Sequence, residues 1–85
     1  MNQVIETIKE VLAEVLQIDS KSIGDNSDIY NEFGMDSLAA VKTLALLDEK
    51  FGIEIPDENL IQIRTPSDLA KLVEACLETQ KRTQI

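Results

Sequence analysis

The 85-residue sequence contains no histidine, no tryptophan and a single cysteine, Cys76. Without histidine, the Ser–His–Asp triad, the Cys–His pair and histidine-ligated zinc sites are excluded. One cysteine forms neither an internal disulfide nor a thiolate metal cluster. Because Cys76 falls on the apolar face of a predicted helix, we expect a buried core thiol. The residue inventory therefore argues against a self-contained hydrolase and against a metal centre.

Basic residues are also scarce. The chain has 8 Lys and Arg against 16 Asp and Glu, so its formal net charge is −8. Such a surface repels nucleic acid and anionic lipid, and it attracts proteins that carry basic patches. We therefore expect neither a nucleic-acid partner nor a membrane partner. Aromatics make up only 4% of the chain, and the apolar 44% is mainly aliphatic, which suits packed helices.

Long apolar runs are missing as well. No stretch approaches the ~20 apolar residues that a membrane-spanning helix needs. The first ten residues, MNQVIETIKE, lack the basic region followed by an apolar run that marks a signal peptide. We expect a monomeric protein of the reducing cytoplasm. Its length predicts one small domain over residues 1–85.

Two stretches have the apolar spacing of amphipathic helices. Over Val4–Leu16 the apolar residues recur at i, i+3, i+4 and i+7 and form one broad stripe. The same spacing returns over Leu38–Phe51. Asp36 or Ser37 is the expected N-cap of this second helix, and Gly52 is its expected stop.

The last helix is predicted from its start signals. Thr65 is the expected cap, Pro66 suits the first helical position, and Asp68 completes the spacing of a capping box. We expect residues 80–85 to be a frayed tail. A brief helical turn is predicted over Pro56–Ile63.

A long polar stretch, Ile18–Met35, separates the first two helices and predicts a loop. Its acidic residues do not form a calcium loop. Placing Gly24 at the sixth position puts Lys21 and Ile23 at ligand positions, and using Gly34 puts an isoleucine first. The apolar residues expected to anchor this loop to the core are Ile18, Ile23, Ile29, Tyr30 and Phe33.

Together these segments predict an all-α fold. No stretch shows sustained strand alternation, and the helices are long enough to cover one another's apolar stripes. We expect a small antiparallel bundle of three main helices plus one short helix, with a long loop between the first two.

Ser37 has two interpretations. In the first it only caps a helix, since Ser and Asp commonly do so. In the second it is modified by another enzyme, because no base for a nucleophilic serine lies nearby and a long polar loop leaves it accessible. A helix start favours a phosphate group at this position. Asp36 beside it could orient a modifying enzyme or a metal ion.

The motif GMDSL, residues 34–38, resembles the attachment motif of acyl carrier proteins. In that family the serine after Gly-x-Asp takes a 4′-phosphopantetheine arm. The run FGIEIPDE, residues 51–58, is similar to the family's pattern after its second helix, and TPSDL precedes a final helix as in the family. Length, acidity and helix order agree over nearly the whole chain.

The resemblance implies that Ser37 anchors the arm, with Asp36 as the adjacent motif residue. A phosphopantetheinyl transferase would add the arm from coenzyme A. The protein would then carry acyl groups as thioesters between the acyl-transferring, ligase or synthase enzymes of a fatty-acid, polyketide or related pathway, without catalysing a reaction itself.

The resemblance also implies two further sets of residues. An acyl chain would be sheltered between the helices, among Leu44, Leu47 and Ile63. Partner enzymes would contact Leu38, Val41, Lys42, Ala45, Asp48, Glu49, Asp57 and Glu58.

The helix after the serine departs from fatty-acid carriers, in which its exposed side is usually acidic. Here Ala39, Ala40 and Lys42 follow, which suggests a dedicated pathway. Met35 stands where peptidyl carriers more often have a second glycine, so an acyl carrier is favoured and an aminoacyl or peptidyl carrier is the alternative. Two other classes stay open: a helical interaction module without cofactor, and a small hydrolase using Ser37.

Overall fold

The computed structural model describes residues 2–55 and 63–83, and within these ranges the chain is helical and contains no strand. Three long helices and one short α-helix are present, which confirms the predicted all-α class. The elements are α1 (Asn2–Leu16), the 3₁₀ helix η1 (Ser20–Ser22), α2 (Ile29–Phe33), α3 (Ser37–Phe51) and α4 (Pro66–Thr83).

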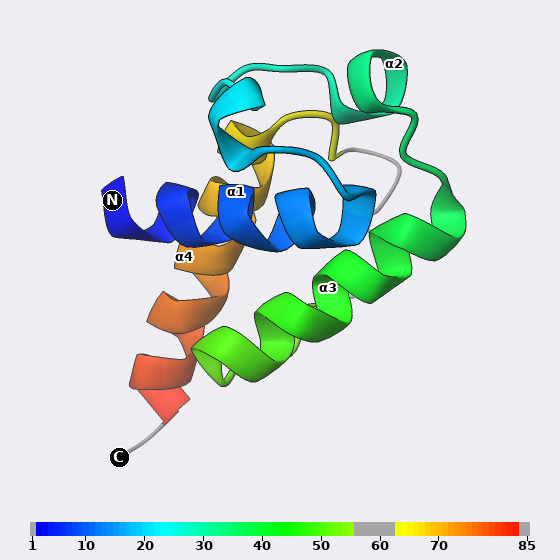
Figure 1. Ribbon diagram of the computed structural model, residues 1–85. Coiled ribbons are helices and arrows are strands. Elements are labelled where there is room, and N and C mark those ends of the chain that lie inside the picture. The colour runs from blue at the N-terminus through cyan, green and yellow to red at the C-terminus, as the bar shows by residue number, and fades with distance from the viewer. Residues whose placement is uncertain (1, 56–62, 84–85) are drawn as a thin grey trace.

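The three long helices surround one core (Figure 1). Helix α3 runs back beneath α1 in the opposite direction, as an antiparallel pair does, whereas α4 crosses behind α1. Helix α1 contacts both α3 and α4. The segment that contains η1 and α2 lies above the end of the bundle and leads directly into α3 (Figure 1).

The apolar stripe of α1 forms the centre of the core. Ile8, Val11 and Leu12 have no exposed surface. They pack with Leu47 of α3 and Val73 of α4, which are equally buried. Fully burying one such side chain stabilises a fold by about 1.5–3 kcal/mol. This aliphatic core therefore explains how so small a chain folds without disulfide bonds.

The helix starts follow the sequence closely, but one predicted end is wrong. Helix α4 continues to Thr83, so residues 80–83 are helical rather than a frayed tail. Gln, Lys and Arg, the residue types at positions 80–82, are good helix formers. Residues 84–85 lie outside the described residues, as does most of the turn predicted over Pro56–Ile63.

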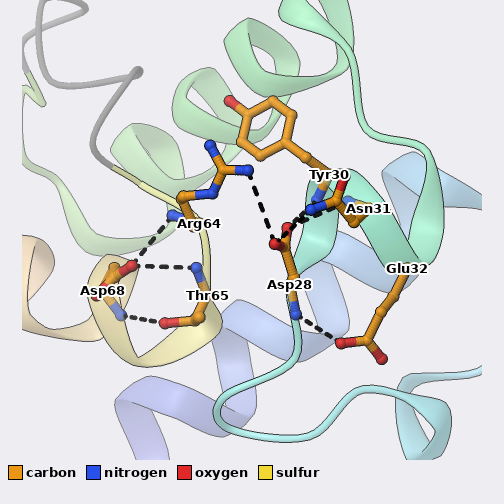
Figure 2. A network of polar contacts seen from close by, with 7 residues as sticks. All are labelled: Asp28, Tyr30, Asn31, Glu32, Arg64, Thr65 and Asp68. Atoms are coloured by element: carbon orange, nitrogen blue, oxygen red, sulfur yellow. Dashed lines mark hydrogen bonds and ion pairs between the residues drawn. The ribbon is translucent and has the colours of Figure 1, made fainter.

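The segment predicted as an irregular loop contains η1 and α2. Asp28 caps α2, because its Oδ1 accepts hydrogen bonds from the Tyr30 and Asn31 N–H groups at 3.1 Å (Figure 2). Glu32 Oε2 accepts the Asp28 N–H at 2.8 Å. The helix ends at Gly34, whose φ of 68° suits glycine. These local bonds build one helical turn that apolar spacing does not show.

The segment is also tied to the other helices, as its apolar residues predicted. Ile23 and Ile29 are buried in the core. The Ser67 N–H donates to the Asp25 carbonyl at 2.9 Å. Lys9 of α1 pairs with the Asp25 carboxylate at 2.5 Å, and this hydrogen bond raises the pKa of Lys9. The segment is therefore fixed at both α1 and α4.

Candidate functional site

Ser37 is the first residue of α3, and Asp36 is its N-cap. Asp36 has an extended backbone, and its Oδ1 accepts the Ala39 N–H at 2.8 Å. Of the two N-cap candidates, the structure therefore selects Asp36. Ser37 is relieved of the capping role, so its hydroxyl is available for other chemistry.

The Ser37 side chain is exposed to solvent. Within the part of the chain that the structure describes, its hydroxyl makes no hydrogen bond, and neither do the Ser37 and Leu38 N–H groups. The first turn of this 15-residue helix contains no acidic residue. A phosphate ester on Ser37 would therefore meet free amide donors and the positive end of the helix dipole.

The segment before Ser37 holds it in place. Met35 is buried at 6% exposure, and its N–H donates to the Ile29 carbonyl at 3.2 Å. Gly34 has a left-handed backbone, where a side chain would be strained. Ser37 is thus fixed by a turn and a buried neighbour, although its hydroxyl faces water.

The surroundings of Ser37 suit modification by another enzyme. The Asp36 carboxylate is engaged by a backbone amide, and the chain has no histidine to act as base. Ser37 can supply a nucleophilic oxygen, but a partner must activate it. The exposed hydroxyl and the free amides fit a phosphodiester-linked group at this position.

An apolar patch adjoins Ser37. Leu38 is 67% exposed and Val41 is 45% exposed, and they are the large hydrophobic side chains that the described residues leave in water. Lys42 and Ala45 are exposed on the same helix. An exposed apolar patch of this kind is typical of a protein-contact surface.

The acidic partner-contact residues differ in their surroundings. Glu49 is exposed, as expected. Asp48 is half-buried, and its Oδ1 accepts the Ile55 N–H at 3.0 Å, so it also stabilises the turn after α3. Asp57 and Glu58 lie outside the described residues.

Two of the positions taken as departures from fatty-acid carriers are not on the exposed side of α3. Ala40 is buried at 4% exposure and Ala39 is half-buried against the core. The Ala39 carbonyl also accepts the Thr43 hydroxyl at 2.9 Å. Packing therefore accounts for the small residues at positions 39 and 40. Of the three departures from fatty-acid carriers, only Lys42 alters the charge of the exposed side of α3.

The residues predicted to shelter an acyl chain belong to one cluster. Leu44, Leu47 and Ile63 are 3%, 0% and 5% exposed and lie in the hydrophobic core. An acyl chain among them would have to displace packed side chains.

Cys76 is half-buried rather than fully buried. Its Sγ lies 3.8 Å from the Glu54 carbonyl oxygen, which accepts its weak hydrogen bond. Burial, and secondarily the Asp48 carboxylate, raises the pKa of the Cys76 thiol. This thiol is therefore protonated at neutral pH and a poor nucleophile.

Comparison with known proteins decides the family. The sequence pattern of a family described as the phosphopantetheine attachment site matches residues 6–73, which include Ser37. The chain belongs to the acyl carrier protein family. Carriers of this family bear a 4′-phosphopantetheine prosthetic group, and the chain is a phosphopantetheine-dependent acyl carrier.

Two of the similar sequences are curated acyl carrier proteins. The acyl carrier protein of Wolinella succinogenes is 37% identical over 71 residues, which cover 84% of this chain and 93% of the relative. The acyl carrier protein of Helicobacter pylori strain G27 is 38% identical over 69 residues, covering 81% and 88%.

Solved structures share the fold. The 3,5-dioxohexyl carrier protein of the actinorhodin polyketide synthase of Streptomyces coelicolor, described as a triketide mimic, has a TM-score of 0.71 and 28% identity, covering 88% of this chain and 91% of that one. A mupirocin didomain carrier protein has a TM-score of 0.79 at 19% identity. This chain spans 45% of that didomain, and the likeness concerns the fold alone.

Among the described residues, no helix is both long enough and apolar enough to cross a membrane.

Proposed function

We propose that the Ser37 hydroxyl is the attachment point of the 4′-phosphopantetheine arm. The observation that carries this proposal is the position of Ser37. It is the first residue of α3, it is exposed, and Asp36 rather than Ser37 caps the helix. A phosphopantetheinyl transferase supplies the base that this chain lacks, and coenzyme A supplies the arm. When attached, the arm holds an acyl group as a thioester on its terminal thiol.

The protein itself acts as a carrier and not as an enzyme. Its role is to present the arm to acyl-transferring, ligase or synthase enzymes in turn. Leu38 and Val41 form the apolar centre of the contact surface, with Lys42, Ala45 and Glu49 around them. Exposed charges at such a rim act mainly on the association rate, which suits brief encounters with many partners.

The pathway is proposed to be a dedicated one, of polyketide or related type, rather than general fatty-acid synthesis. Lys42 supports this proposal, because it places a cation next to the apolar patch in a protein whose net charge is −8. The likeness to the actinorhodin carrier at 28% identity supports it as well. The acyl group itself is set by the partner enzymes.

The attachment is tested by intact mass after incubation with coenzyme A and a broad-specificity transferase. The wild-type protein and Ser22→Ala should gain one phosphopantetheine, whereas Ser37→Ala should gain none and stay folded. Ser22 is a matched control because it is also exposed and helical. An arm found on Ser37→Ala would exclude the assignment.

A further inference from the structure

Arg64 lies just before α4 and contacts the start of α2 in three ways, and Figure 2 shows the two that its side chain makes, with Asp28 and Tyr30. Its Nη2 lies 3.7 Å from Asp28 Oδ2. Its guanidinium carbon lies 5.6 Å from the centre of the Tyr30 ring, a distance at which a cation is attracted to an aromatic face. Its backbone carbonyl accepts the Ile29 N–H at 2.9 Å. Arg64 thus contacts Asp28, Ile29 and Tyr30, three successive residues at the start of α2.

The backbone of Arg64 is itself held by α4. The Arg64 and Thr65 N–H groups donate to Asp68 Oδ2 at 3.1 and 3.2 Å. The Asp68 N–H donates in return to Thr65 Oγ1 at 3.1 Å, which completes the predicted capping box (Figure 2). Arg64 therefore reaches α2 from an anchored position on the bundle.

Helix α2 needs such support. It has 5 residues, far fewer than an isolated helix needs for stability in water. Only Gly34, Met35 and Asp36 separate its last residue from Ser37. The Met35 N–H is bonded to the Ile29 carbonyl, so the connecting segment is tied to α2. Loosening of α2 would therefore reach the N-cap of α3.

We propose that Arg64 is a positioning residue for the modification of Ser37. By holding α2 against the start of α4, it keeps the Gly34–Asp36 segment in the one arrangement that presents the Ser37 hydroxyl correctly. The transferase binds this arrangement, so losing Arg64 lowers the fraction of carrier that is competent to bind. Apparent affinity falls by that fraction, whereas turnover of the bound carrier does not. This inference rests on the proposed attachment at Ser37.

The test compares transferase kinetics on purified variants. Arg64→Ala and Arg64→Gln should raise KM for the carrier, by at most about threefold, because losing exposed contacts of this kind shifts the equilibrium between competent and loosened carrier by about that factor, and they should leave kcat unchanged. Arg64→Lys keeps a cation near Asp28 and Tyr30 and should restore most of the affinity. Lys71→Ala is the matched control, since it removes an exposed cation from α4 far along the chain from α2 and should behave as wild type.

Amide hydrogen exchange gives a second readout that does not depend on the transferase. The Asn31, Gly34 and Met35 amides should exchange faster in Arg64→Ala than in wild type, and Lys71→Ala should not change them. A wild-type KM in either folded Arg64 variant, or unchanged exchange at these amides, would overturn the proposal. So would an Arg64→Lys variant as impaired as Arg64→Ala. If wild-type carrier were not modified at all, the attachment at Ser37 would be wrong instead.

Discussion

Asp36 and Ser37 have separate tasks at the start of α3. Asp36 accepts the Ala39 N–H and so begins the helix. Ser37 keeps a free, exposed hydroxyl one residue later. Sequence alone could not separate the two, because both residue types cap helices well. The backbone conformation identifies Asp36 as the N-cap, since Asp36 is extended and Ser37 is already helical.

The capping role of Asp36 predicts a clear loss of stability. Asp36→Ala should lower the free energy of unfolding by about 1 kcal/mol, because the Ala39 N–H loses its acceptor. Asp36→Asn should lie close to wild type, since asparagine caps as well as aspartate. Urea denaturation followed by circular dichroism measures both. Equal stability of Asp36→Ala and wild type would show that the cap contributes nothing.

Lys42 is expected to set this carrier apart from those of fatty-acid synthesis. A test adds negative charge at two positions of α3. The first is Lys42, and the second is Ala45, which is exposed on the same helix, whereas Ala39 is half-buried and unsuited to a charge. Lys42→Glu with Ala45→Glu makes the local charge more negative by about three units, two from the first change and one from the second. The double variant that carries the arm with a free thiol should be a better substrate for a fatty-acid synthase malonyl transferase, which moves the malonyl group from malonyl-coenzyme A to that thiol, through a faster association rate.

The gain should be several-fold in kcat/KM at low salt, and it should shrink as salt is added, because exposed charges are screened. Lys71→Glu with Ala75→Glu is the control, since it makes the same charge change at exposed positions of α4. Equal gains in both double variants would mean that net charge matters and that the position of Lys42 does not.

The long helices were predictable because each carries an apolar stripe and clear end signals. Helix α3 begins one residue before Leu38 and ends at Phe51 as predicted, and α4 begins at Pro66. Helix α2 was missed, because 5 residues are too few to show a helical period. Its signal was present nonetheless: Asp28 before Ile29, Glu32 four residues after the cap, and Gly34 after the last turn.

The contact between Arg64 and α2 could not be predicted from sequence. It joins residues far apart in the chain, and the Arg64 side chain is still 55% exposed, so no burial pattern marks it.

The capping of α2 predicts a pH dependence. The Asn31 N–H above all, together with the Asn31 side chain, Arg64 and the Tyr30 N–H, lowers the pKa of Asp28 below its ordinary 3.8. A carboxylate with a lowered pKa contributes stability above the pKa of the unfolded chain and loses it as pH falls through the folded pKa. Asp28→Ala should therefore melt below wild type at neutral pH.

In acid the two melting temperatures should converge, because Asp28 becomes protonated in wild type as well. Thermal melts followed by circular dichroism from about pH 7 to about pH 2.5 would measure the difference. Glu10→Ala, at an exposed position of α1, is the control for a lost carboxylate. A difference between Asp28→Ala and wild type that stayed constant through the acid range would contradict the capping account.

Taken as a whole, the described part of the molecule has an aliphatic core that holds three long helices together. The resemblance to acyl carrier proteins predicts that this core also shelters an acyl chain. Leu47 and Leu12 are both fully buried in it, but only Leu47 belongs to the predicted shelter. Aliphatic side chains repack more readily than a rigid aromatic core would, which fits the scarcity of aromatics at 4%.

Leu47→Ala and Leu12→Ala should each lower the free energy of unfolding by roughly 2–5 kcal/mol, because both leave a cavity. Loading the arm with a medium-length acyl chain should restore part of the loss in Leu47→Ala, since the chain can fill the space. Leu12→Ala should recover less. Urea denaturation measures the free energy of unfolding of each variant with and without the acyl chain. If the acyl chain restored equal amounts of stability to both variants, a shelter at Leu47 would be contradicted.

The general class of the protein could be predicted from its resemblance to acyl carrier proteins. The motifs GMDSL, FGIEIPDE and TPSDL carried this resemblance together with length, acidity and helix order, and the family match confirms it. Which residues of α3 face solvent could not be predicted as well, because Ala39 and Ala40 suit either face. The structure buries Ala40 and leaves Ala39 half-buried against the core.

The most direct measurement follows the acyl group itself. A broad-specificity transferase first attaches the acetylated arm of acetyl-coenzyme A to the carrier. The intact mass is then measured before and after treatment with neutral hydroxylamine. Fragmentation of the tryptic peptide Ser22–Lys42 locates the arm among its three serines, Ser22, Ser27 and Ser37. We expect one acetylated arm on Ser37, loss of the acetyl group alone on treatment, and no arm on Ser37→Ala. An arm on another serine, or an acetyl group that resists hydroxylamine, would contradict a thioester carried at Ser37.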